Sequence, residues 1–249
     1  MNCSGRRAAC SQKEFAADAA VSTKVGSARC ADRTPQRGVP TGLPLRTAAA
    51  TLPGVKESGW KTISSERHFA NAHLGVVTDH VQTPTRTRPR TWTIVHRKAA
   101  VVIAPMMQDG KIVLICQERI PIREAIWEMP SGQIDNRNAN HVEITQVALR
   151  ELREESGYEL AEGGELIPLG HYFSSPGFTD EHAYFFLARP VVACPNYVRD
   201  ESESILDCRA FTVSEICGMI AENEIRDGNT LSLLARLWAC GLLPIEVCK

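Results

Sequence analysis

"ALRELREESGY" (148–158) packs five charged side chains into eleven residues of a chain whose formal net charge is only −1. Glu151, Glu154 and Glu155 stand at offsets of three and four, and at about 100° per residue they share one side of a helix. Like charges at this spacing repel and destabilise a helix by about 0.2–0.5 kcal/mol per pair. The run is explained either by a solvated helix face or by a divalent cation such as Mg²⁺, which prefers carboxylate and carbonyl oxygens.

The sequence around this run predicts a turn followed by a helix. Asn140 is a helix N-cap with Glu143 three residues later, and Gly157 is a C-terminal stop. We therefore expect a helix over 141–156. Upstream, "EMPSGQID" (128–135) is a strand followed by a Pro-Gly turn, which would bring backbone carbonyls to the same end of the helix. Carbonyl and carboxylate oxygens at one place strengthen the metal interpretation.

Strand and helix patterns follow one another from Trp60 onward. Gly110 in "QDG" predicts a turn between two strands, because glycine takes positive φ freely. The expected strands are 90–97, 99–107, 111–119, 125–130, 182–189 and 206–211. Further helices are expected from the capping box "TVSE" (212–215) and over "TLSLLARLWAC" (230–240). Strands interleaved with helices indicate a mixed α/β domain.

The composition limits the classes of function. At 249 residues with 43% hydrophobic residues, the chain supports one packed soluble domain with extensions. The near-zero net charge does not indicate binding to nucleic acid or to an anionic membrane surface. No apolar run approaches the roughly 18 residues that a membrane-spanning helix needs. Nine cysteines, an odd number without any C-x-x-C pair, disfavour a disulfide framework or a zinc site. They favour a reducing, cytoplasmic location.

Residues 1–55 differ in composition from the rest of the chain. Through residue 50 they hold eight basic residues against three acidic ones, with no sustained hydrophobic period. We expect a disordered or non-native N-terminal extension. An organelle transit peptide is the alternative, although acidic residues interrupt it. The expected division is therefore the extension, an N-terminal β segment over 56–98 and the main domain over 99–249.

Gly132 and "RELREESGY" (150–158) together resemble the Nudix box, a loop–helix–loop motif. The second half of that motif, Arg-Glu-apolar-x-Glu-Glu-x-Gly-apolar, is matched at every specified position. The first half departs from it. Seventeen residues separate Gly132 from Arg150 where the family has thirteen, and neither Asn138 nor Val142 is the expected glutamate.

The resemblance implies an α/β fold of the Nudix type. That fold is an α/β/α sandwich with a mixed sheet, here preceded by a small N-terminal antiparallel β extension. The family hydrolyses nucleoside diphosphates that are linked to a further group. Metal ions serve this chemistry because they polarise the phosphoryl group and lower the pKa of the attacking water.

The resemblance also assigns roles within the box. Mg²⁺, for which Mn²⁺ can substitute, would be bound by the backbone carbonyl of Ser131 and by the three glutamates, Glu151, Glu154 and Glu155. Arg150 and Glu151 are the box residues expected to take part in catalysis, and the arginine would hold a glutamate in position. The alternative for Arg150 is a simple ion pair with Glu154.

A base for the attacking water is expected outside the box. "DESES" (200–204) resembles an acidic loop that supplies a catalytic glutamate in bacterial ADP-ribose pyrophosphatases. Glu201 and Glu203 are the candidates there, and Glu181 is a third. A solvated acidic loop without a role in catalysis is the alternative.

Other stretches indicate an ADP-linked substrate. "SSPGFTDE" (174–181), which contains Pro176, resembles the Ser-Pro-Gly segment of ADP-ribose pyrophosphatases, and the extra residues before it fit "AEGGEL" (161–166) as a turn. "SGWK" and "PRTWTIVHR" resemble the N-terminal strands of ADP-sugar diphosphatases, in which two tryptophans sandwich adenine across a dimer interface. Trp60 and Trp92 match those positions. A place in the core is the alternative for both.

Three further side chains are expected to contact the substrate. "QERIPI" and "IWEMPSG" match the family's path into the box. Arg119 would then contact a phosphate and Glu128 the distal ribose, unless the two are surface salt-bridge residues. Arg97, at the end of the first expected strand, is the third.

We therefore expect a Mg²⁺-dependent ADP-ribose pyrophosphatase of nucleotide-sugar metabolism. It would cleave a small nucleotide diphosphate, ADP-ribose, to AMP and ribose 5-phosphate, and it would act as a homodimer. Another nucleotide-sugar or NAD(H) pyrophosphatase is one alternative. A non-catalytic Nudix domain that binds such ligands as a sensor is the other, and the longer first half of the box is the feature in its favour.

Overall fold

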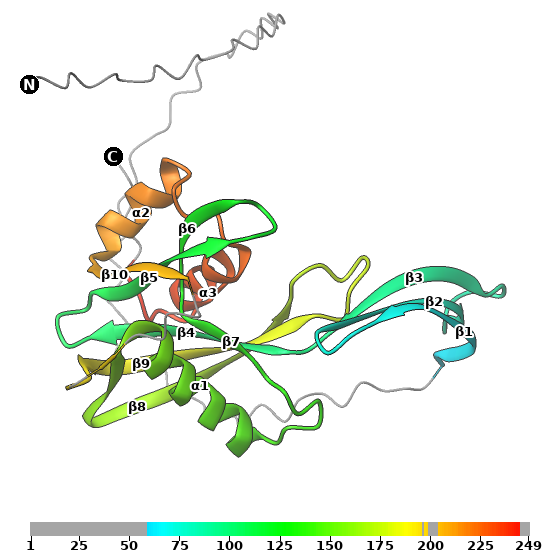
Figure 1. Cartoon of the computed structure of the whole chain (residues 1–249), viewed down its shortest axis with the longest axis horizontal. Helices are drawn as coiled ribbons and strands as arrows, with labels where there is room; N and C mark the ends of the chain where they lie inside the picture. The colour runs from blue at the N-terminus through cyan, green and yellow to red at the C-terminus, as the bar shows by residue number, and fades with distance from the viewer. Residues whose placement is uncertain (1–58, 196, 199–203, 245–249) are drawn as a thin grey trace, which may run out of the picture. The chain divides into compact units, whose positions relative to one another are not determined.

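The computed structural model describes residues 59–195, 197–198 and 204–244, which form two β-sheets and three helices (Figure 1). These residues all belong to one compact unit, 49–249. The expected extension, 1–55, lies outside the described residues. Within the described ranges, no helix is long and apolar enough to cross a membrane.

A three-stranded antiparallel sheet in the order β1-β2-β3 begins the described chain. Its strands are β1 (Lys61–Ala70), β2 (Leu74–Gln82) and β3 (Arg90–Arg97). Every residue of β1 is exposed, and none of the three strands contains a fully buried residue. The expected N-terminal antiparallel extension is therefore confirmed, and β3 has the bounds that the sequence predicted. This sheet builds no core of its own.

The second sheet has seven strands and is mixed. Its main path runs β10-β5-β4-β9-β8, with β6 paired to β5 and β7 paired to β4. Only the β4–β9 pair is parallel among the described pairs of this sheet. The bounds are β4 (Ala100–Met107), β5 (Ile112–Arg119), β6 (Glu124–Glu128), β7 (Ser131–Gln133), β8 (Tyr158–Phe173), β9 (His182–Ala193) and β10 (Ile205–Phe211). Each strand expected in this region is present, and β9 continues four residues beyond its expected end.

Helices cover both faces of the mixed sheet, as Figure 1 shows. Consecutive buried residues of β4 point alternately to the two faces, so this strand contributes to the core on both sides of the sheet. On one face, α1 (His141–Ser156) packs against Val101 and Ile103. On the other face, α2 (Val213–Ala221) and α3 (Gly228–Ala239) pack against a cluster that contains Val102 and Ala104. The predicted α/β/α sandwich is confirmed.

Helix α1 begins and ends where the sequence predicted. The Asn140 side chain accepts from the backbone N–H groups of Val142 and Glu143, and the Glu143 carboxylate accepts the Asn140 N–H at 2.7 Å. At the other end, Gly157 takes a left-handed conformation with φ 73°. This capping is local, so the sequence around the helix suffices to specify it.

The turn expected over 161–166 does not end a strand. These residues lie inside β8, which pairs with β9 on both sides of an irregularity between Leu160 and Glu165. Gly163 has φ 73° within this irregularity. The glycines thus produce a bulge in a long strand, since the pairing partner continues past it.

Candidate active site

The three box glutamates differ in burial although they share one turn of α1. Glu151 and Glu155 are only 5% and 4% exposed, because they lie one turn apart on the side of the helix that faces the sheet. The Glu154 side chain is 46% exposed. The solvated-face interpretation is therefore wrong for Glu151 and Glu155, and buried carboxylates require compensating partners.

The turn before the helix supplies two such contacts. The backbone N–H of Ser131 donates to the Glu155 carboxylate at 2.5 Å. Gly132 lies directly against Glu151, and a Cβ on this glycine would fall 1.9 Å from the Glu151 carboxyl carbon. Glycine is thus required here by close approach. The Pro-Gly turn therefore lies against the carboxylates of α1, and the contact from Ser131 is made by its N–H. The Ser131 carbonyl as a metal ligand stays a prediction.

Arg150 supplies the positive charge between the glutamates. One guanidinium nitrogen lies 2.6 Å from Glu151 and another lies 2.5 Å from Glu154. Burial by itself would lower the pKa of Arg150, but the two carboxylates outweigh it and raise that pKa. Arg150 therefore pairs with both Glu151 and Glu154, and its part in catalysis stays a prediction.

The oxygen atoms at the box match the preference of a divalent cation in chemistry. Three carboxylates on one helical turn carry more negative charge than the one guanidinium that bridges them, and hard cations prefer such oxygens. Gly132 also leaves room against Glu151 that any side chain would fill. Across the described part of the chain, however, no group of three or more His, Cys, Asp or Glu side chains stands in a metal-binding arrangement. The chemistry of the residues fits, and a cation would have to draw the carboxylates together.

Glu128 and Arg119 form a pair at the end of β6. Glu128 is 1% exposed, and its two carboxylate oxygens lie 2.7 and 3.1 Å from Arg119 nitrogens. Burial raises the pKa of Glu128 to about 7, although Arg119 opposes this shift. A surface salt bridge is therefore the wrong description of Glu128, and this carboxyl group titrates near neutral pH.

The loop 174–181 contacts the edge of β3. The Trp92 indole N–H donates to the Gly177 carbonyl at 2.7 Å, and the Val95 N–H donates to the Phe178 carbonyl at 2.8 Å. The structure thus brings Trp92 together with the loop that contains Pro176, which is itself exposed. No local sequence pattern indicated this contact, because 85 residues separate Trp92 from Gly177.

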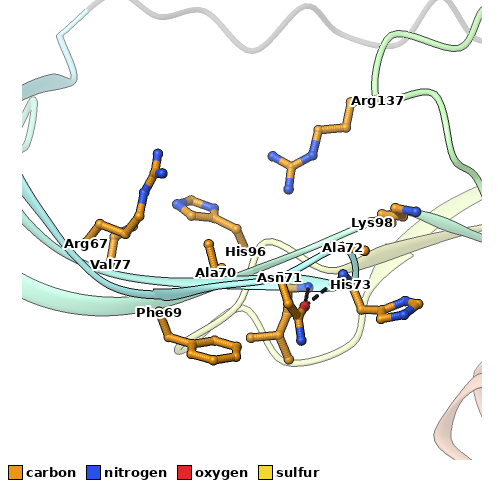
Figure 2. A pocket seen from close by; sticks show the side chains of 12 residues that line it. Arg67, Phe69, Ala70, Asn71, Ala72, His73, Val77, His96, Lys98 and Arg137 are labelled. Atoms are coloured by element: carbon orange, nitrogen blue, oxygen red, sulfur yellow. Dashed lines mark hydrogen bonds between the residues drawn. The ribbon is translucent and has the colours of Figure 1, made fainter.

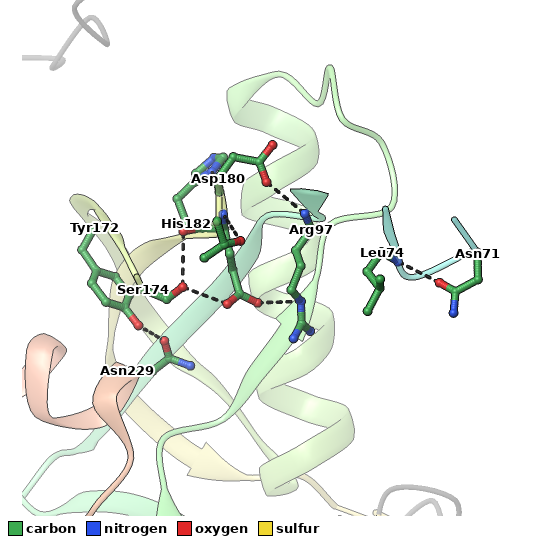
Figure 3. A network of polar contacts seen from close by, with 10 residues as sticks. Asn71, Leu74, Arg97, Tyr172, Ser174, Asp180, His182 and Asn229 are labelled. Atoms are coloured by element: carbon green, nitrogen blue, oxygen red, sulfur yellow. Dashed lines mark hydrogen bonds and ion pairs between the residues drawn. The ribbon is translucent and has the colours of Figure 1, made fainter. Parts of the chain in front are cut away.

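Glu181 lies at the end of the same loop. Its carboxylate accepts from the Ser174 hydroxyl at 2.8 Å and pairs with Arg97 at 2.9 Å (Figure 3). It lines a cavity of about 300 Å³ beside the start of α3. Glu181 and Arg97, two predicted site residues, are therefore neighbours. The other base candidates, Glu201 and Glu203, lie outside the described residues.

The same cavity contains residues that the sequence analysis missed. Tyr172 donates to the side chain of Asn229 (Figure 3), and burial followed by the charges of Asp227 and Glu181 raises the pKa of Tyr172 to about 12. Asp227 is the N-cap of α3 and accepts from Thr230. The capping pattern "DGNT" was available as a signal for the helix start, but nothing local links it to Tyr172.

Trp60 and Trp92 are surface residues. They are 60% and 57% exposed, so the core interpretation is wrong for both. Trp60 immediately precedes Lys61, which pairs with Gln82, whereas Trp92 pairs with Asp79. Trp60 is thus displaced from Trp92 by four residues along β2, and β1 and β3 are two strand spacings apart. These displacements put the two Cα atoms roughly 16 Å apart.

Comparison with known proteins gives the family context. Residues 95–234 match the NUDIX domain. The chain is 30% identical over 171 residues to a methanol dehydrogenase activator from Bacillus methanolicus, covering 69% of this chain and 88% of that protein. It is 26% identical over 170 residues to an ADP-ribose pyrophosphatase from Bacillus subtilis, covering 68% and 88%.

A solved structure supports the fold. A crystal structure of an ADP compounds hydrolase superposes with a TM-score of 0.60 at 16% identity, covering 74% of this chain and 96% of that one. A shorter match, 36% identical over 98 residues, links the chain to a GDP-mannose pyrophosphatase from Klebsiella pneumoniae, covering 38% of this chain and 46% of that protein.

Proposed function

The chain belongs to the Nudix family of hydrolases, and we propose that it hydrolyses the diphosphate of ADP-ribose to AMP and ribose 5-phosphate. The observation that carries this proposal is the box itself. Glu151 is buried against Gly132 and Glu155 against the Ser131 N–H, and Arg150 bridges two of the three glutamates. Such burial of charge opposes folding, and a catalytic role accounts for its presence.

The carboxylates of Glu151, Glu154 and Glu155 and the carbonyl of Ser131 would hold Mg²⁺, with Mn²⁺ as a substitute. When bound, the cation lowers the pKa of the attacking water and offsets the charge that gathers on the phosphoryl oxygens. Arg150 keeps Glu151 and Glu154 in place, and the Ser131 N–H orients Glu155.

The remaining residues would bind the two ends of the substrate. Trp60 and Trp92 are exposed and free to stack on adenine, while Arg97 and Arg119 offer guanidinium groups to the phosphates. Glu128 would contact the distal ribose. Because its pKa lies near 7, it can donate a hydrogen bond below that pH and accept above it. Pro176 would shape the loop beside Trp92.

The general base is proposed among Glu181, Glu201 and Glu203. Glu181 is supported by its place in the cavity, where Ser174 and Arg97 orient its carboxylate. Replacement of each glutamate by glutamine distinguishes the three. The base variant should lose turnover while its KM for ADP-ribose stays near the wild-type value.

We also propose a homodimer that works in the cytoplasm. Trp60 and Trp92 are both exposed on the N-terminal sheet, where a second copy would supply the opposite ring of an adenine sandwich. The five cysteines among the described residues are all free thiols, which supports a reducing compartment.

A substrate panel tests this function. ADP-ribose, other nucleotide sugars such as GDP-mannose, and NADH are compared at equal Mg²⁺ by kcat/KM. We expect the highest value for ADP-ribose, with AMP and ribose 5-phosphate released in equal amounts. A higher value for GDP-mannose or NADH would assign the site to that substrate instead. Binding of ADP-ribose without turnover would favour the sensor alternative.

A further inference from the structure

A second group of basic side chains lines a cavity beside the N-terminal sheet. The cavity has a volume of about 360 Å³ and lies at the turn between β1 and β2, near the end of β3 and the segment that leads into α1. Its basic residues are Arg67, His73, His96, Lys98 and Arg137 (Figure 2). We propose that this cavity binds the phosphate group of a small phosphorylated molecule, separately from the box carboxylates.

The register of the sheet places two of these side chains on one face. Arg67 pairs with Val77, and Val77 pairs with Ile94, so these three side chains point to the same side. His96 follows Ile94 by two residues and therefore shares that side. Figure 2 shows Arg67 and His96 projecting to the same side of the ribbon, with the Arg137 side chain reaching toward them from another segment.

The charges in the cavity are only partly balanced. Lys98 pairs with Asp135 at 2.7 Å, and His96 pairs with Asp180 at 2.6 Å. Arg67 and Arg137 form no ion pair with any carboxylate of the described chain. Two guanidinium groups therefore face one cavity without an acidic partner. A bound anion would relieve their repulsion, and the guanidinium fork matches phosphate oxygens well.

The walls of the cavity suit a small ligand. Its lining includes the short residues Ala70, Ala72 and Gly75, which take up little of the space beside the basic side chains. The turn beside it is held in one conformation, because Asn71 accepts from the N–H groups of His73 and Leu74 at 2.8 Å each. A volume of about 360 Å³ is at the lower end of small-molecule pockets, which favours a metabolite of nucleotide size or less.

Arg137 comes from the unusual part of the box. It lies in the segment between Gly132 and Arg150 that is four residues longer than the family pattern. None of the catalytic roles proposed above uses this segment. A contribution of Arg137 to a second anion site therefore gives the extra residues a function of their own, which does not depend on the identity of the hydrolysed substrate.

Calorimetric titration with inorganic pyrophosphate and with orthophosphate, in EDTA and without nucleotide, tests the proposal. EDTA removes divalent cations and so abolishes metal-dependent binding at the box, whereas guanidinium groups need no metal. We expect saturable binding of at least one anion to the full-length protein. Arg67→Gln and Arg137→Gln should each weaken it at least about fivefold, as expected for loss of a charge-assisted contact. The Arg67 and Arg137 variants then separate binding in this cavity from binding at Arg97 and Arg119.

Arg153→Gln is the matched control, because Arg153 is exposed on α1 and does not line this cavity. It makes the same change in net charge and should leave the affinity as in the wild type. The proposal is overturned if the wild-type protein binds neither anion, or if all three variants bind alike. Neither result depends on whether the protein hydrolyses ADP-ribose, so the two proposals fail independently.

Discussion

Single residues at the box balance charge against burial. Glu155 is compensated by a backbone N–H and Glu151 by Arg150, while Gly132 makes room for the Glu151 carboxyl group. The helical spacing predicted that the three glutamates share one side of α1. It could not predict their different depths, because depth depends on how the turn before the helix packs.

Replacement of Gly132 by alanine tests the close approach. The new methyl group would overlap the Glu151 carboxyl group, so either this side chain or the turn must move. We expect kcat to fall at least about tenfold and the free energy of unfolding to fall by about 1–3 kcal/mol. Steady-state kinetics and urea denaturation measure the two effects.

Gly218→Ala serves as the control for that substitution. Gly218 lies inside α2 with open space where a Cβ would be, so alanine should stabilise the helix by about 0.5–1 kcal/mol and leave kcat unchanged. Equal kinetics for the two alanine variants would show that Gly132 has no special role.

The buried Glu128 predicts a pH-dependent stability. Its ordinary pKa of 4.5 applies to the unfolded chain, and its pKa in the folded protein is about 7. Between these values the folded protein binds more protons, so the free energy of unfolding should fall as the pH rises from about 5 to 8. The expected loss is on the order of 3 kcal/mol.

Denaturation of the wild-type protein and of Glu128→Gln across this pH range measures the contribution. The glutamine variant lacks the titrating group, so its stability should fall less. Parallel curves for the two proteins would show that Glu128 ionises at the same pH in the folded and unfolded states.

Elements were predictable from sequence where their signals are local. The capping residues of α1 predicted both of its ends, and continuous apolar runs predicted β4 and β5. By contrast, β8 was not predicted, because the Gly-containing segment 161–166 has a sequence typical of a turn. Pairing with β9 makes this segment part of the strand. The contact of loop 174–181 with β3 could not be predicted from the sequence either, since Trp92 and Gly177 come together only in the folded chain.

At the level of the N-terminal sheet, the exposed tryptophans predict a binding phenotype. Trp60→Ala and Trp92→Ala should each raise KM for ADP-ribose about tenfold and change kcat little, since stacking contributes equally to the ground and transition states. Trp92→Phe keeps a ring but loses the hydrogen bond to Gly177, and it should fall between the wild type and the alanine variant. Unchanged KM in both alanine variants would contradict an adenine role.

In the whole molecule, the N-terminal sheet β1–β3 stands out because it has no hydrophobic core of its own. Four large apolar side chains in this region are more than half exposed, namely Trp60, Ile63, Phe69 and Trp92. Exposed apolar side chains on one small sheet are characteristic of an interaction surface. We therefore expect exchange of sheets between two copies around a two-fold axis.

Light scattering at micromolar concentration tests the assembly. One chain has a mass of 27.4 kDa, so a dimer should give about 55 kDa, twice that value. A mass of one chain would rule out a shared adenine site, and the tryptophans would then have to act within a single copy.

The most direct test of the central claim is the turnover of ADP-ribose by the wild-type protein and by Glu155→Gln, with Mg²⁺ present. The account predicts release of AMP and ribose 5-phosphate by the wild type. It also predicts a kcat at least about a hundredfold lower in the variant, because the Glu155 carboxylate would help to offset transition-state charge. Glu154→Gln should behave in the same way, whereas Arg153→Gln should retain wild-type turnover. Absence of wild-type turnover with either Mg²⁺ or Mn²⁺, or a near-normal kcat in Glu155→Gln, would contradict the account.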